Sequence, residues 1–180
     1  TRPLDEAYMD DIASAFGQVV DAKSPFTAGH SERVGFYAEM IAQELSLPKA
    51  QAHWIKRVGL LHDVGKIGTP AWVLRKPGRL TPEEWDLMRA HPTMGEAIVR
   101  GLLDMQEVID IVGCHHERWD GKGYPQGLKG EEIPIGARIL TIVDYFDAVT
   151  TERPYHKALS HESAIGLLKH EAGRALDTKL

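Results

Sequence analysis

Five histidines and two aspartates with the character of metal ligands lie in five separate stretches of the sequence, and this scatter constrains the fold more than any other feature. They are His30, His62, Asp63, His91, His115, His116 and Asp144. A divalent-metal site needs neutral imidazoles and carboxylates that a folded scaffold brings together. Seven donors are too many for one ion, but they suit two ions that share a bridging carboxylate, an arrangement that cleaves phosphodiesters. We therefore expect a fold in which the five stretches meet, and a metal-dependent hydrolase.

The composition narrows the class of protein. The chain has 180 residues, 43% of them hydrophobic, which is enough for one domain with a substantial core. Its net charge of −5 argues against DNA as a partner, although a metal cluster would still attract a small anionic substrate. The single cysteine, Cys114, excludes an internal disulfide and a cysteine-based zinc site, and it suits the cytoplasm. No apolar run approaches the ~18 residues of a membrane span.

Apolar residues recur at three-to-four spacing through most of the chain, which predicts an all-α fold with no strand. Thr81-Pro82-Glu83-Glu84 predicts a capped helix start, and this helix is expected to carry His91 and to be kinked by Pro92. The expected helices cover residues 4–22, 29–45, 48–63, a stretch from 81, and 104–116, 134–150 and 160–170. They form a bundle of about seven helices.

Two segments fall outside this core pattern. Residues 117–134 cannot be helical because four glycines and two prolines specify turns there, and a loop of that length in a compact domain is usually functional. Residues 1–22 are expected either to act as a signalling linker, which could pair with a second copy in a homodimer, or to pack on the core. The chain begins Thr-Arg-Pro without an initiator Met. We interpret residues 1–180 as a single domain excised from a longer sensor protein.

Each candidate ligand also has an ordinary structural interpretation. A lone His62-Asp63 pair at a helix end is weak evidence, and His115-His116 could be an exposed polar cap that continues into Glu117. His30 and His91 would each be ordinary structural histidines if they stood alone. Together the set favours metal binding, because clustered buried imidazoles need partners.

The seventh donor, Asp144, and two further residues, Asp147 and Lys66, are candidates for roles at or around the metal ions. Asp144 follows an apolar run, so its carboxylate is expected to be buried and to need a metal or a cation. Asp147, one turn later, either orients a histidine or forms a polar edge. Lys66 suits a phosphate oxygen beside two metal ions, and otherwise it is a surface lysine past a helix end.

Four motifs occur in order along the chain. They are Gly29-His30-Ser31-Glu32-Arg33-Val34, Leu61-His62-Asp63-Val64-Gly65-Lys66-Ile67-Gly68, His115-His116-Glu117-Arg118-Trp119-Asp120-Gly121-Lys122-Gly123-Tyr124-Pro125 and Arg153-Pro154-Tyr155. With these motifs, the chain from about Thr27 to Asp177 resembles the HD-GYP domain, a subgroup of the HD phosphohydrolase superfamily. The resemblance implies hydrolysis of cyclic dinucleotides, chiefly cyclic di-GMP, to the linear dinucleotide or GMP at iron or manganese centres.

The resemblance also implies roles for single residues. It makes the seven donors metal ligands, with Asp63 as the bridge between two ions that activate a hydroxide. Lys66 would contact the scissile phosphate, Tyr124 with Pro125 would line the guanine pocket, and Arg153 would hold a phosphate. A forked guanidinium matches phosphate oxygens, and a tyrosine ring offers a base a face for stacking.

Two departures from the family pattern alter these expectations. Members with three metals have a glutamate four residues before the first ligand histidine, where this chain has Phe26, so we expect two metals. His156 stands where the family usually has a lysine or arginine near the substrate phosphates, and a histidine is a weaker, pH-dependent cation.

Two alternatives stay open. The substrate could be another cyclic dinucleotide such as cyclic GMP-AMP, because the sequence does not orient the edges that distinguish guanine from adenine. The chain could instead be a catalytically silent signalling module that docks a GGDEF-type cyclase through the loop. The complete ligand set disfavours the second alternative.

Overall fold

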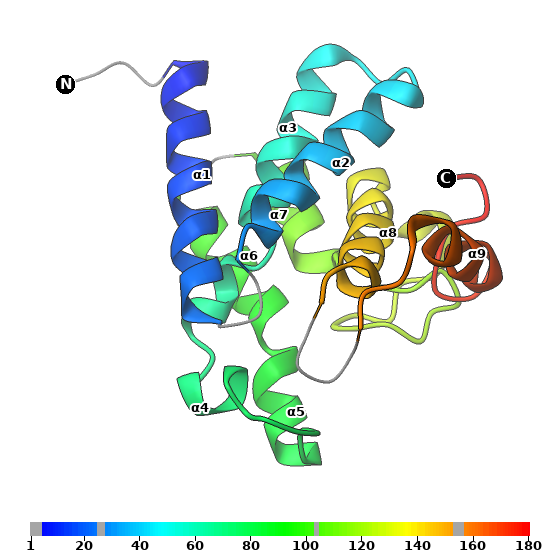
Figure 1. Ribbon diagram of the computed structural model, residues 1–180. Coiled ribbons are helices and arrows are strands. Elements are labelled where there is room, and N and C mark those ends of the chain that lie inside the picture. The colour runs from blue at the N-terminus through cyan, green and yellow to red at the C-terminus, as the bar shows by residue number, and fades with distance from the viewer. Residues whose placement is uncertain (1–4, 25–27, 103–104, 153–156) are drawn as a thin grey trace.

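The computed structural model describes residues 5–24, 28–102, 105–152 and 157–180. The predicted all-α class is confirmed, since this part of the chain contains helices and a single isolated β-bridge but no strand. The helices, shown in Figure 1, are α1 (Glu6–Lys23), α2 (His30–Glu44), α3 (Lys49–Leu61), α4 (Ala71–Leu74), α5 (Pro82–Arg89), α6 (His91–Leu102), α7 (Gln106–Cys114), α8 (Ile135–Thr150) and α9 (His161–Glu171), with 3-10 turns η1 (Val64–Ile67) and η2 (Gly130–Glu132).

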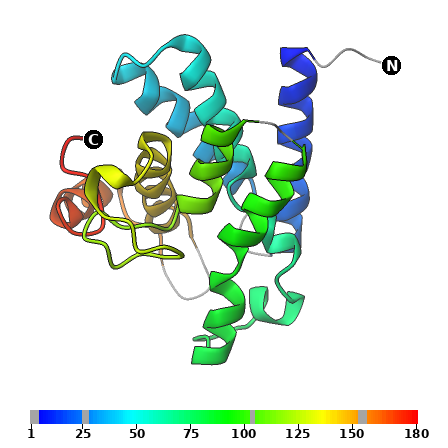
Figure 2. The same ribbon diagram turned by 180° about the vertical axis from the view of Figure 1, so that it is seen from behind.

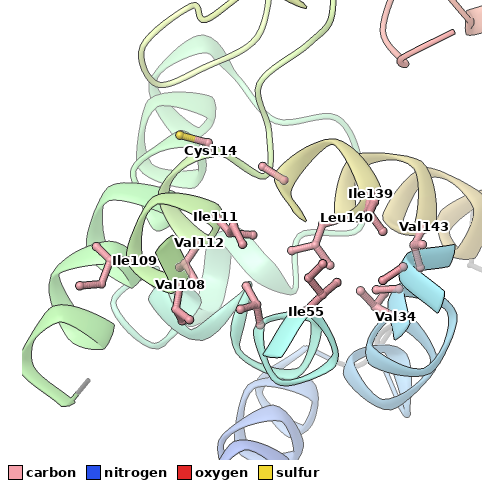
Figure 3. Close-up of a cluster of buried hydrophobic side chains, with 14 of the residues drawn as sticks. Val34, Ile55, Val108, Ile109, Ile111, Val112, Cys114, Ile139, Leu140 and Val143 are labelled. Carbon is pink, nitrogen blue, oxygen red and sulfur yellow. The ribbon is translucent and has the colours of Figure 1, made fainter. Parts of the chain in front are cut away.

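The hydrophobic core forms where four helices meet. Val34 of α2, Ile55 of α3, Val112 of α7 and Leu140 of α8 are all almost fully buried in one cluster. Figure 3 shows their side chains pointing toward one another. Burial of this apolar surface fixes the four helices relative to one another. Each of these helices carries or adjoins a candidate ligand at one end or on its surface.

Helices α2 and α3 approach unusually closely, because each has a glycine at the contact. A Cβ atom placed on Gly59 would lie 2.7 Å from the Cα atom of Gly35 and 2.9 Å from its backbone nitrogen. Real side chains do not tolerate such distances. The close approach brings the start of α2, which carries His30, next to the end of α3, which leads to His62.

Helix α1 packs on the core in this structure, and a role as a signalling linker stays a prediction. Ala13 and Phe16 of α1 cluster with Leu60 and Leu61 of α3. At its C-terminal end the Lys23 ammonium donates hydrogen bonds to the backbone carbonyls of Lys66, Ile67 and Thr69, at 3.0, 2.5 and 2.7 Å. The last turn of α1 therefore holds the segment that carries Lys66.

The helix predicted from Thr81 is divided in two. The capping box of Thr81 and Glu84 is present, but α5 ends at Arg89, and α6 begins anew at His91. The prediction of one kinked helix was therefore wrong in this detail. Pro92 lacks a backbone N–H, so it fits the first turn of a new helix as well as it fits a kink. The division places His91 at a helix start. Figure 2, seen from behind, shows α5 and α6 one above the other.

The loop over residues 117–134 is not helical apart from η2, as predicted. It lies beside α8 and α9 in Figures 1 and 2. Backbone hydrogen bonds from Trp119 to Ala175 and from Asp120 to Arg174, at 3.1 and 2.8 Å, tie it to the C-terminal segment. Within the described ranges, no helix combines the length and the apolar character that crossing a bilayer requires.

The contact between α2 and α3 generates the first prediction. Gly59→Ala is expected to lower the free energy of unfolding by about 2 kcal/mol, because the added methyl group overlaps the α2 backbone. Gly166→Ala in α9 is the matched control, since a Cβ there has nothing within 4 Å. The control should raise the free energy of unfolding by about 0.5–1 kcal/mol, because alanine favours helix. Urea denaturation measures both, and equal effects from the two variants would contradict the close packing.

Candidate metal centre

The five stretches that carry the predicted ligands meet in space. Their ligand atoms form two groups, within each of which all ligand atoms lie within 4.8 Å of one another. The first group contains Asp63, His91, His115 and His116, and the second contains His30, His62 and Asp144. The predicted convergence is therefore present for all seven residues.

Asp63 lies between the two groups. Its Oδ1 atom is 3.2 Å from Nε2 of His91 and 3.9 Å from Nε2 of His115. Its Oδ2 atom is 3.5 Å from Nε2 of His62 and 3.8 Å from Nε2 of His30. One oxygen thus faces each group, which is the position that a bridging carboxylate needs.

The donors stand at helix ends, where side chains project beyond the regular hydrogen bonding. His30 and His91 begin α2 and α6, while His62 and His115 directly follow α3 and α7. Asp144 is the exception and lies within α8. Its predicted burial is met only in part, because 27% of its side chain borders solvent.

Glycine permits one close approach that the site requires. A Cβ atom on Gly65 would lie 1.9 Å from the carbonyl oxygen of His91, so no other residue fits there without moving the backbone. Gly65 follows Asp63 by two positions. Its missing side chain therefore lets the segment after α3 touch the start of α6.

Three of the histidines are each held by a hydrogen bond of the same kind. Nδ1 of His62, His91 and His115 each lies 2.7 Å from the backbone carbonyl three residues earlier. A carbonyl only accepts, so each Nδ1 carries the proton and donates it. Each Nε2 is then left with a free lone pair that points into the site.

His30 is held by a carboxylate in place of a carbonyl. Its Nδ1 lies 2.8 Å from Oδ2 of Asp147, and Arg33 donates to the same carboxylate from Nε at 2.5 Å and from Nη2 at 3.1 Å. Burial alone would raise the pKa of Asp147, but the hydrogen bonds from His30 and Arg33 lower it to about 2. Of the two roles predicted for Asp147, the structure places it where it orients a histidine.

The inward lone pairs face one another. Nε2 of His91 lies 3.2 Å from Nε2 of His115, and Nε2 of His30 lies 3.4 Å from Nε2 of His62. Oδ1 of Asp63 is buried and has no hydrogen-bond partner within the described part of the chain. Unprotonated imidazole nitrogens and a carboxylate oxygen packed this closely in a buried site are unfavourable unless a cation binds between them. The donor set therefore fits divalent metal ions.

The charges of the site agree with metal binding. Burial and the neighbouring His116 and His62 hold the pKa of His115 well below its usual value, and burial lowers the pKa of His116 to about 4. Both imidazoles are therefore neutral, as ligands must be. Burial opposes ionisation of Asp63, but the ammonium of Lys66 at 2.5 Å keeps its pKa well below the ordinary range.

The other predicted site residues lie as follows. Lys66 pairs with Asp63 and is half-buried, so it is not an ordinary surface lysine. The Tyr124 ring stacks on the imidazole of His116, with centroids 4.9 Å apart and planes at 22°, and Pro125 beside it is exposed. Arg153, His156 and Phe26 lie outside the described residues.

The role of Glu117 was not predicted, since this residue figured only as the continuation of an exposed polar cap in the ordinary structural interpretation of His115-His116. Glu117 is 1% exposed, and its carboxylate accepts hydrogen bonds from the backbone nitrogens of Gln126, Gly127 and Leu128 at 2.7, 3.1 and 3.0 Å. This side chain thus anchors the loop that carries Tyr124 directly beside His116. Its position next to the two histidines was the available signal.

A comparison with protein families agrees with this geometry, since the model described as HD domain matches residues 15–180. The chain belongs to the HD domain family. The 3′3′-cGAMP-specific phosphodiesterase 3 of Vibrio cholerae is 44% identical over 175 residues, covering 97% of this chain and 38% of that protein. The cyclic di-GMP phosphodiesterase of Thermotoga maritima is 37% identical over 171 residues, covering 94% of this chain and 46% of that protein. The chain thus spans less than half the length of these relatives.

Solved structures give the same fold. The crystal structure of a cyclic GMP-AMP-specific phosphodiesterase from V. cholerae matches with a TM-score of 0.59 and 40% identity, covering 97% of this chain and 39% of that one. An HDG"Y"P protein from Bdellovibrio bacteriovorus matches with a TM-score of 0.68 at 21% identity, covering 94% of this chain and 60% of that one. At 21% identity, the match to the B. bacteriovorus protein shows a shared fold and no shared function.

The anchoring of the loop generates a prediction for Glu117→Gln. The amide NH₂ group would face backbone donors, so at least one hydrogen bond is lost, and the free energy of unfolding should fall by about 1–3 kcal/mol. Hydrogen exchange at the amides of residues 126–128 should become faster.

Glu131→Gln is the control, because Glu131 is 69% exposed and pairs only with Lys179 among the described residues. It should change stability by less than about 0.5 kcal/mol. If the two variants behave alike in urea denaturation and in exchange, the carboxylate of Glu117 does not anchor the loop.

Proposed function

We propose that this chain is a single catalytic domain that hydrolyses a cyclic dinucleotide, in the first place cyclic di-GMP, to the linear dinucleotide or GMP. The observation that carries the proposal is the position of Asp63, with one carboxylate oxygen toward each of two groups of buried donors. Such a pair of sites suits phosphodiester cleavage. The activities of the HD-domain relatives support the substrate class.

Two divalent ions, which we propose to be iron or manganese, would occupy the two groups. His30, His62 and Asp144 would hold one ion, and His91, His115 and His116 would hold the other, with Asp63 shared. Mixed imidazole and carboxylate sets suit both metals. When bound, the ions supply Lewis acidity that offsets negative charge on the phosphate in the transition state.

The residues around these donors would handle the substrate. Lys66 keeps its ammonium beside Asp63, where it would stabilise charge on a non-bridging phosphate oxygen. Tyr124, with Pro125, would border the guanine pocket while its ring holds His116 in place. Contacts of Arg153 and His156 with the substrate phosphates are proposed from the resemblance to the HD-GYP domain alone.

A second substrate has specific support. The relative that is 44% identical over 97% of this chain is specific for 3′3′-cGAMP. This cyclic dinucleotide differs from cyclic di-GMP in one base only, so the same donors would cleave it. Relative turnover of the two nucleotides by the same preparation decides between them.

We also propose partners and a cellular location for the protein. A GGDEF-type cyclase would dock on the loop over residues 117–134, and α1 could pair with a second copy in a homodimer. A cytoplasmic location is proposed from the lone cysteine, which is buried.

The test of the proposed function uses protein purified without oxygen and loaded with Mn²⁺ or Fe²⁺. We expect it to convert cyclic di-GMP or 3′3′-cGAMP to linear products, identified by chromatography and mass spectrometry. Lys66→Ala should lower kcat about 100-fold with little loss of metal, because it removes charge stabilisation and no ligand.

Lys169→Ala, at an exposed position of α9, is the control and should leave kcat unchanged. Metal-loaded protein that binds both nucleotides but leaves them intact would contradict the enzymatic proposal and favour the silent docking module. Equal loss of metal and turnover in Lys66→Ala would contradict the role of that residue.

A further inference from the structure

A row of side chains leads from the metal centre to the protein surface. The first is Tyr124, which stacks on His116. The guanidinium carbon of Arg89 lies 5.7 Å from the centroid of the Tyr124 ring and 5.8 Å from the ring of Trp85. Trp85 is 44% exposed. The row therefore runs outward from a candidate ligand, through Tyr124 and Arg89, to an exposed indole.

The guanidinium of Arg89 is free to bind a ligand. Arg89 is exposed, and within the described ranges it forms neither an ion pair nor a hydrogen bond, only the two ring contacts. Two other arginines near the site are engaged, Arg33 with Asp147 and Arg118 with Asp120. An unengaged arginine beside two aromatic rings at the edge of a catalytic centre is therefore a candidate for contact with the substrate.

The helix that carries this pair is held at its start and lies next to a candidate ligand at its end. Arg89 and Trp85 are four residues apart on α5, so their side chains share one face. The start of α5 is held by the capping box between Thr81 and Glu84, and its end passes directly into the segment that carries His91. Arg89, the last residue of α5, therefore lies only two positions before the candidate ligand His91.

The hydrogen-bond donors of Arg89 and the ring of Trp85 suit the binding of a guanine base. A guanidinium donates two parallel hydrogen bonds, and guanine presents two acceptors, O6 and N7, on one edge. Adenine has a donor, the N6 amino group, in place of O6, so it cannot accept both bonds. The indole of Trp85 offers a face on which either base can stack.

We propose that Trp85 and Arg89 form a base-binding subsite outside Tyr124, and that Arg89 selects guanine there. This inference rests on the proposed function, because it concerns the substrate of the same site. With the scissile phosphate at the metal ligands, one nucleoside of a cyclic dinucleotide extends past Tyr124 toward α5. Cyclic di-GMP and 3′3′-cGAMP both supply a guanine, whereas cyclic di-AMP does not.

The test measures kcat/KM of the metal-loaded protein for cyclic di-GMP and cyclic di-AMP. The unmodified protein should favour cyclic di-GMP by about tenfold or more. Arg89→Met should reduce this preference about tenfold by slowing only the guanine substrate. Arg89→Lys keeps the positive charge but loses the two parallel N–H donors of the guanidinium, so it should give an intermediate preference. Arg100→Met, on α6 and paired with Glu96, is the control and should change nothing.

A second pair of variants tests the indole. Trp85→Leu should raise KM for cyclic di-GMP about fivefold or more, because a stacking face is lost. Trp72→Leu, at another exposed tryptophan on α4, should leave KM unchanged. If both tryptophan variants leave KM unchanged, Trp85 is not part of a base subsite.

The outcomes separate this inference from the function it rests on. Failure of the unmodified protein to cleave any cyclic dinucleotide overturns both. Cleavage of cyclic di-GMP with an unchanged preference in Arg89→Met overturns only the guanine subsite. An equal loss for both substrates in that variant also overturns it, because Arg89 would then bind a phosphate.

Discussion

The structure depends on one electrostatic constraint, the inward direction of imidazole lone pairs around a buried anion. Nδ1 of His62, His91 and His115 is committed to a carbonyl and Nδ1 of His30 to Asp147, so four Nε2 atoms converge near Asp63. Such a cluster is unfavourable in an interior unless cations share the electron pairs. The fold therefore has to hold the donors together against their own repulsion.

The helices supply that restraint from outside the site. The apolar cluster of α2, α3, α7 and α8 fixes the helices, and the glycine contact between α2 and α3 sets their spacing. Polar anchors then hold the segments between helices. Lys23 binds the carbonyls after Asp63, and Glu117 binds the loop that places Tyr124 on His116. Each donor is thus positioned by contacts that do not themselves need the metal, which is the preorganisation that catalytic sites require.

Much of this arrangement could be predicted from the sequence, and the exceptions share a cause. Helices with a clear apolar period and a capping residue, such as Ser160 before α9, were predicted nearly to the residue. The meeting of the seven donors was predicted because five histidines and two aspartates form one set of metal-ligating residue types, and the structure brings them together. That they bind metal stays a prediction. Glu117 and the break between α5 and α6 were not predicted, because tertiary contacts decide them. A glutamate beside exposed-looking residues becomes buried only when three loop amides need its carboxylate.

The central claim, that Asp63 joins two metal sites, is tested most directly by electron paramagnetic resonance of the protein titrated with Mn²⁺ without oxygen. We predict that two ions bind per chain and that their spectra show exchange coupling, because the ions share one carboxylate. Asp63→Asn should abolish the coupling. A single bound ion, or two ions whose spectra are independent of each other in the unmodified protein, would contradict the account.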